Sequence, residues 1–176
     1  MMDPDPVWML PESAMSWIES TLPNGAHILE FGSGHGTDRL ARRFEMLSVE
    51  HDAEWVERCP TPCIHAPIEE NATSFSAGEQ GWYRLSVVLE SIPTDLDLVI
   101  VDGPPGSIGR TGLLQSLHAL PSDVPFIVDD VHRQAESALF MKLEAWHSGS
   151  ATWHWMEHDG IAKGRAWGIL MVEGGQ

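Results

Sequence analysis

The sequence is poor in basic residues. Only 10 of its 176 residues are Lys or Arg, against 26 Asp and Glu, which gives a formal net charge of −16. A protein that binds nucleic-acid phosphates needs clustered basic side chains, and ten scattered ones do not form such a patch. We therefore expect no nucleic-acid partner and a small molecule as substrate.

Long apolar runs are also missing. None approaches the roughly 18 residues of a membrane-spanning helix, and the N-terminal sequence MMDPDPVWML is acidic and interrupted by proline, unlike a signal peptide. We expect no membrane partner and a cytoplasmic location. No internal repeat, low-complexity tract or linker divides the sequence. We therefore expect a single domain over residues 1–176, with an N-terminal arm and covering helix in residues 1–25 and the core in residues 26–173.

Cysteine is scarce, and its two copies lie close together, as Cys59 and Cys63 in the segment CPTPC. A zinc site would need two further ligands at matching spacing, and the sequence shows none. A disulfide does not suit a reducing compartment. We interpret both cysteines as structural.

The most informative stretch is residues 27–52, HILEFGSGHGTDRLARRFEMLSVEHD. Residues 28–31 form a short, largely apolar run bounded by glycines, which is typical of a strand that is buried on both faces. A glycine-rich loop follows in residues 32–36, and apolar residues then recur at helical spacing. A second apolar run, residues 44–49, ends in Glu50. The order predicts a strand, a glycine loop, a helix and a second strand.

The glycine loop and Glu50 together predict a nucleoside site. Three glycines in five residues let the backbone turn sharply and approach a ligand closely, and the helix that follows favours an anionic group at its N-terminus. Glu50 lies 20 residues after Glu30, at the tip of the next strand. A carboxylate there can accept hydrogen bonds from both hydroxyls of a ribose. A glycine turn that only joins a strand to a helix is the alternative.

The glycine spacing resembles that of one family of nucleoside-binding proteins. A dinucleotide site has G-x-G-x-x-G, whereas Thr37 stands at the third position here and the glycines fall as G-x-G-x-G. Preceded by Glu30, they form E-x-G-x-G-x-G, which resembles the motif of the class I S-adenosylmethionine-dependent methyltransferases. The resemblance implies S-adenosylmethionine as cofactor, with its methionine end at the loop and its ribose at Glu50. The residues expected to bind it are Glu30, Gly32, Ser33, Gly34, Gly36, Thr37, Glu50, His51 and Asp102; for His51, a solvent-exposed position is an equal alternative.

The rest of the chain completes an α/β pattern. Residues 97–102 and 124–128 predict two buried strands, and residues 152–158 and 165–172 predict an antiparallel pair at a sheet edge. The other expected elements are helices over residues 11–22, 82–92, 113–120 and 135–146, a short strand at residues 63–66 and a loop over residues 67–81. The expected fold is a single Rossmann-like, doubly wound, mostly parallel sheet with a C-terminal antiparallel hairpin.

Acidic residues follow two of these strands, at the edge where open α/β sheets bind ligands. Asp102 follows one strand, and Asp129 and Asp130 follow the next. Adjacent carboxylates repel each other, so hydrogen bonds, a cation or raised pKa values must offset the repulsion. Ordinary acidic surface loops are the alternative in so acidic a chain.

The motifs EFGSGHGT, VEHD, VDGPPG and DDVHR extend the resemblance over nearly all of residues 12–173. They look most like small bacterial O-methyltransferases of sugars or small hydroxylated metabolites. Asp102, Asp129 and Asp130 are also similar to the Asp…Asp-Asn metal triad of catechol-type O-methyltransferases, with Asp130 in place of Asn. The resemblance implies a small-molecule acceptor with a hydroxyl group, and Mg²⁺ or another divalent cation as a possible second cofactor.

Methylation of a hydroxyl requires that its proton be removed. We expect Asp102, Asp129 and Asp130 to act as the general base or as metal ligands, and His132 is a further candidate base. Arg133, or Arg110, can orient an anionic acceptor, although each also suits an ordinary helix surface.

Two other functions stay open. A non-catalytic S-adenosylmethionine-binding or accessory protein would carry the same motifs. A nicotinamide-dependent oxidoreductase is less favoured, because Thr37 breaks the dinucleotide pattern and we expect no second, substrate-binding domain.

Overall fold

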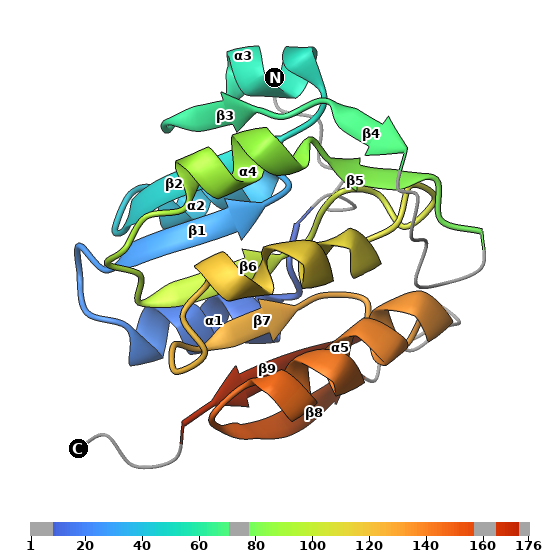
Figure 1. The fold of residues 1–176 in the computed structure, drawn as a ribbon. Coiled ribbons are helices and arrows are strands. Elements are labelled where there is room, and N and C mark those ends of the chain that lie inside the picture. The colour runs from blue at the N-terminus through green and yellow to red at the C-terminus, as the bar shows by residue number, and fades with distance from the viewer. Residues whose placement is uncertain (1–8, 71–77, 157–164, 173–176) are drawn as a thin grey trace.

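A seven-stranded sheet forms the centre of the protein (Figure 1). The structure is a computed structural model and describes residues 9–70, 78–156 and 165–172. The strands of this sheet are β1 His27–Phe31, β2 Glu45–Glu50, β3 Cys63–His65, β6 Leu98–Val101, β7 Phe126–Val128, β8 Ser150–Met156 and β9 Arg165–Met171. They lie in the order β3-β2-β1-β6-β7-β9-β8. Only the pairs that include β9 are antiparallel. The predicted doubly wound sheet with its C-terminal antiparallel hairpin is confirmed.

Helices cover both faces of the sheet (Figure 1). One face carries α1 (Glu12–Thr21) and α2 (His35–Leu40), and α3 (Ala53–Arg58) leads from β2 to the edge strand β3. The other face carries α4 (Leu85–Ser91), the 3₁₀ helix η2 (Thr111–Ala119) and α5 (Gln134–Trp146). None of the helices in the described part of the chain is both long and apolar enough to cross a membrane.

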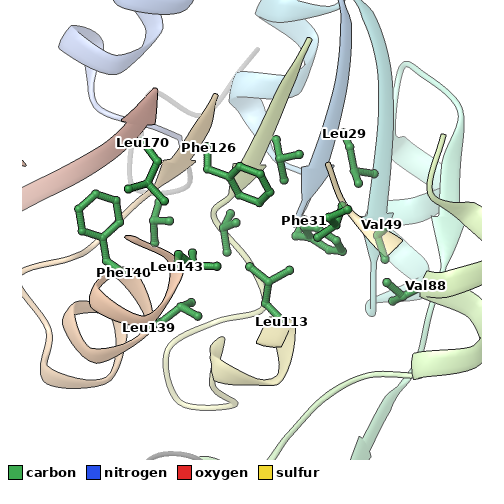
Figure 2. Close-up of a cluster of buried hydrophobic side chains, with 14 of the residues drawn as sticks. Leu29, Phe31, Val49, Val88, Leu113, Phe126, Leu139, Phe140, Leu143 and Leu170 are labelled. Atoms are coloured by element: carbon green, nitrogen blue, oxygen red, sulfur yellow. The ribbon is translucent and has the colours of Figure 1, made fainter. Parts of the chain in front are cut away.

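The central strands supply two hydrophobic cores, one on each face, because successive residues of a strand point to opposite sides. On β1, Ile28 packs with α1, whereas Leu29 and Phe31 join the core beneath α4, η2 and α5. Figure 2 shows this second core, where Phe31 and Phe126 lie among leucines from η2 and α5. Because both faces of β1 are buried, its apolar residues follow one another without the alternating polar residues of a half-exposed strand.

The segment after β3 differs from the prediction. Instead of a loop over residues 67–81 and a helix from Trp82, β4 (Ile68–Glu70) pairs antiparallel with β5 (Gly81–Tyr83), and α4 starts only at Leu85. Trp82 and Tyr83 are both fully buried, beside Phe31. Their burial favours a strand, which the helical spacing from Trp82 onward concealed. Residues 71–77 of the expected loop lie outside the described residues.

Other boundaries agree more closely. The helix expected at residues 113–120 is present, but as the 3₁₀ helix η2, and the expected helix at residues 135–146 is α5. The hairpin strand predicted at residues 152–158 runs over Ser150–Met156. Residues 1–8 of the expected N-terminal arm, and residues 157 and 158 of the expected strand, lie outside the described residues.

Candidate active site

Glu30 connects β1 to the glycine loop through a chain of hydrogen bonds. Its buried carboxylate accepts hydrogen bonds from Thr37 Oγ1 at 2.7 Å and from Ser48 Oγ at 2.8 Å. Thr37 Oγ1 in turn accepts one from the Gly34 N–H at 3.0 Å. Burial raises the pKa of Glu30 to about 7, although the two hydroxyl donors oppose this shift. Thr37, which broke the dinucleotide pattern, is therefore the residue that fixes the loop.

Gly32 has to be glycine for two reasons. Its φ of +91° lies in the left-handed region, and a Cβ there would come within 2.7 Å of the Gly103 Cα. Gly103 follows β6, so the loops after β1 and β6 are in contact. Gly36 has a packing role instead, because a Cβ would approach the Met9 side chain at 3.2 Å. Gly32 is thus needed for the contact between two loops, whereas Gly36 is needed for the packing of α2 against Met9.

Glu50 lies beside this loop at the end of β2. One carboxylate oxygen accepts the Ser33 N–H at 2.9 Å, and the other accepts the N–H groups of His51 and Asp52 at 2.7 and 2.9 Å. The His51 Nδ1 is 2.6 Å from the second oxygen. Burial would raise the pKa of Glu50, but the His51 ring and the Asp52 and Ser33 N–H groups outweigh it and hold the pKa below its usual value. Glu50 is therefore an ionised carboxylate that is fixed beside the glycine loop.

The His51 side chain is held in place by the carboxylate of the preceding residue, Glu50. Its ring is half-buried, and the close contact with the Glu50 carboxylate raises its pKa against the opposing effect of burial. His51 is therefore not fully exposed to solvent, because its ring lies against the Glu50 carboxylate.

The predicted acidic cluster also comes together. Asp102, Asp129 and Asp130 each place one carboxylate oxygen within 4.8 Å of the others. Asp129 is fully buried, Asp130 has a φ of +59°, and the Asp102 side chain keeps 24% of its surface exposed. The three acids therefore share one site, and Asp102 is the most accessible of them.

Arg110 is a buried residue that places its positive charge next to this acidic cluster. Its side chain is 4% exposed, and its Nη2 lies 3.3 Å from Asp130 Oδ2 and 3.5 Å from Asp102 Oδ1. Nε and Nη1 donate to the backbone oxygens of Pro104 and Asp129 at 3.0 and 3.1 Å. This buried guanidinium braces the cluster, so Arg110 is not the helix-surface residue that the sequence interpretation offered as one alternative. Its bracing role carries no motif that a single sequence could reveal.

His132 and Arg133 lie at the exposed side of the cluster. The Ala166 N–H of β9 donates to His132 Nδ1 at 3.2 Å, which engages that nitrogen as an acceptor. Arg133 Nη1 lies 2.9 Å from Asp130 Oδ2, and its side chain is 44% exposed. Arg133 keeps accessible donor surface, whereas His132 has one ring nitrogen committed to the backbone.

Glu136 is an acid of this region that the sequence interpretation missed. It is buried in α5, with Oε1 3.8 Å from Arg133 Nη1, and burial raises its pKa. It is one of several helical glutamates, and nothing in its local sequence marks it. Four carboxylates and two guanidiniums therefore gather here.

Cys59 directly follows α3, and Cys63 is the first residue of β3, opposite Ser48 of β2. Both are free thiols and partly exposed, and the Cys59 Sγ is 3.4 Å from Thr61 Oγ1. Burial raises the pKa of Cys63 to about 12. A protonated thiol is a poor nucleophile and metal ligand, which agrees with a structural role.

The site as a whole lies at the carboxyl ends of β1 and β6, the two strands at which the strand order reverses. From β1 the chain proceeds outward to β2 and β3, and from β6 outward to β7 on the other side. The glycine loop and Asp102 follow the two strands on either side of this point. Open α/β sheets bind ligands there, outside the carboxyl ends of the strands.

Solved structures with a similar fold include several methyltransferases. The O-methyltransferase TomG from Streptomyces achromogenes, in complex with S-adenosylmethionine, is 17% identical with a TM-score of 0.60, over 96% of this chain and 83% of that one. A candidate O-methyltransferase from Klebsiella pneumoniae is 14% identical with a TM-score of 0.60, over 96% and 84%. An rRNA methylase from Streptococcus thermophilus is 10% identical with a TM-score of 0.59, over 98% and 100%. No protein-family model matches the sequence, and no curated protein does.

Proposed function

We propose that this chain, which has the class I methyltransferase fold, is an S-adenosylmethionine-dependent methyltransferase that acts on a hydroxyl of a small molecule. The observation that carries the proposal is the arrangement of Glu30, the glycine loop and Glu50. Glu30 fixes the loop through Thr37, and the ionised Glu50 stands beside it. That combination suits a ligand with a ribose at one end and a charged amino-acid group at the other.

The acidic cluster stands on the acceptor side of this arrangement. The contact between Gly32 and Gly103 brings the residue before Gly103, Asp102, next to the glycine loop. Methyl transfer requires an acceptor oxygen in line with the methyl group and the sulfur, and a destination for its proton. Asp102 is the most exposed of the three aspartates, so we assign the proton-accepting role to Asp102 and a supporting role to Asp129. His132 is the weaker candidate base because its Nδ1 is engaged by Ala166.

A divalent cation fits part of this donor set. Asp102 and Asp129 offer the oxygen ligands that Mg²⁺ prefers, and a cation bound to them would acidify an acceptor hydroxyl. Asp130 is paired with both Arg110 and Arg133, at 3.3 and 2.9 Å, whereas Asp102 has a longer contact, of 3.5 Å, with Arg110. We therefore infer a weak cation site in which Asp130 is at most an outer partner. Titration with Mn²⁺, followed by its paramagnetic signal, would detect the site, and Asp102→Asn should abolish the binding; equal binding by the variant would contradict the assignment.

The charge of the protein favours a small acceptor over RNA. The similar structures include an rRNA methylase, yet a net charge of −16 opposes binding to a polyanion. The exposed Arg133, at the edge of the acidic cluster, suits an acceptor that carries one carboxylate or phosphate.

A screen with isotope-labelled S-adenosylmethionine tests this function. The acceptors should be hydroxylated sugars, uronates and phenols, with an RNA preparation as a separate arm. Label transfer to a hydroxylated small molecule is expected, whereas transfer to RNA alone would overturn the proposed acceptor class. Cofactor binding without transfer to any acceptor would favour the non-catalytic binding protein.

A further inference from the structure

Tyr83 is the last residue of β5 and belongs to none of the motifs of the sequence. Its side chain is 1% exposed. Its ring stacks on Phe31 with centroids 6.1 Å apart, meets Trp82 edge-on at 4.8 Å, and lies 6.2 Å from the ring of His51. Tyr83 is thus fixed between the last residue of β1 and the histidine that contacts Glu50.

The hydroxyl of Tyr83 reaches the point where the two ligand-side loops meet. A Cβ on Gly103 would lie 2.6 Å from this hydroxyl and 2.6 Å from the Gly32 Cα. The absence of a side chain at Gly103 therefore makes room both for the glycine loop and for the phenol oxygen. This point lies at the carboxyl ends of β1 and β6, the neighbouring strands at which the order of strands reverses.

The hydroxyl has no hydrogen-bond partner among the described residues. A buried hydroxyl without a partner lowers stability relative to a phenylalanine at the same position, so a hydrogen-bond acceptor from a ligand would explain why the residue is tyrosine. Burial, and then the charge of Glu50, raise the pKa of Tyr83 well above its usual value. The group is therefore a protonated donor close to the carboxylate that is placed for a ribose.

We propose that the Tyr83 hydroxyl donates a hydrogen bond to the nucleoside part of the bound cofactor. The inference rests on the proposed function and adds a binding residue to it. Glu50 and Tyr83 are equally covered, at 4% and 1% exposure, and the half-buried ring of His51 is adjacent to both.

The test compares Tyr83→Phe with the wild type in calorimetric titrations of S-adenosylhomocysteine and 5′-methylthioadenosine, which share the nucleoside and differ in the amino-acid end. Loss of one hydrogen bond should weaken both ligands by about 5- to 20-fold, while the melting temperature stays equal or rises. Ser116→Ala is the matched control. Ser116 is also fully buried, and its Oγ has no partner among the described residues, but it lies in η2. Its affinities should equal those of the wild type.

Tyr83 is the only tyrosine in the chain, which permits a test without mutation. Wild-type protein labelled with ¹³C at the tyrosine Cζ should give one resonance, and that resonance should shift when either ligand is added. Wild-type affinity in Tyr83→Phe together with an unmoved resonance would overturn the inference while leaving the proposed function intact. A loss confined to S-adenosylhomocysteine would also overturn it, because the contact would then belong to the amino-acid end. Failure of the wild type to bind either ligand would remove the proposed function itself.

Discussion

The two ends of the candidate site, which we propose bind the cofactor and the acceptor, balance the charges of their carboxylates by different means. At the cofactor end, Glu30 and Glu50 are met by hydroxyls, backbone N–H groups and one imidazole. At the acceptor end, the aspartates are met by the guanidiniums of Arg110 and Arg133. Side-chain donors such as the Ser33 hydroxyl, 3.4 Å from Glu50, can be replaced by ligand hydroxyls. A buried guanidinium held by four acceptors instead fixes the local structure.

The largest effect on stability should come from removing the buried positive charge of Arg110. Arg110→Met leaves Asp102 and Asp130 without their buried partner and two backbone oxygens without a donor. Breaking a buried ion pair from one side costs about 3–5 kcal/mol, and we expect a loss of that size in the free energy of unfolding, measured with urea.

Arg133→Met is the control for Arg110, because Arg133 also contacts Asp130 but is 44% exposed. Its cost should stay below about 1 kcal/mol. Equal losses for the two variants would show that burial does not distinguish these guanidiniums.

At the cofactor end, the main effect should be on binding. Glu50→Ala removes the carboxylate that we propose accepts the ribose hydroxyls, and two charge-assisted hydrogen bonds are worth about 3 kcal/mol, or roughly 100-fold in Kd for S-adenosylhomocysteine. The control is Glu45→Ala, at an exposed position of the same strand. Circular dichroism should confirm that both variants are folded, and an unchanged Kd in Glu50→Ala would exclude Glu50 from the site.

The neutral surroundings of Glu30 predict a pH effect. Its pKa of about 7 in the folded protein lies above the ordinary 4.5, so the folded state retains a proton that the unfolded state loses. Its contribution to stability is therefore complete below pH 4.5 and is lost as the pH rises to 7, by up to about 3 kcal/mol.

Glu30→Gln stays neutral at every pH and should lack this loss. The difference in unfolding free energy between Glu30→Gln and the wild type should grow in favour of the variant from pH 5 to pH 8. Glu45→Gln, with its exposed carboxyl, should show no such trend. A constant difference for Glu30→Gln would mean that Glu30 ionises normally in the folded protein.

The smallest effect is expected outside both ends. Replacing Cys59 and Cys63 together by Ser should change the unfolding free energy by no more than about 0.5 kcal/mol and leave the affinity for S-adenosylhomocysteine unchanged. A drop in the melting temperature of the wild type on mild reduction would instead reveal a disulfide.

The contrast between the two ends also explains what the sequence could predict. The strand, glycine loop and Glu50 lie within residues 27–52, where local spacing determines geometry, and the structure places them as expected. The contacts of Arg110, Glu136 and Tyr83 depend on segments far apart in the chain, and none of the three belongs to a local motif. The hairpin of β4 and β5 was missed because Trp82 continues the helical spacing of α4, although it is buried in a strand.

The most direct test of the central claim is a calorimetric titration of the wild-type protein with S-adenosylhomocysteine and, separately, with NAD. The geometry of Glu30, Thr37 and Glu50 predicts saturable binding of S-adenosylhomocysteine at one site per chain and no measurable binding of NAD. Binding of NAD, or of neither ligand, would contradict the account.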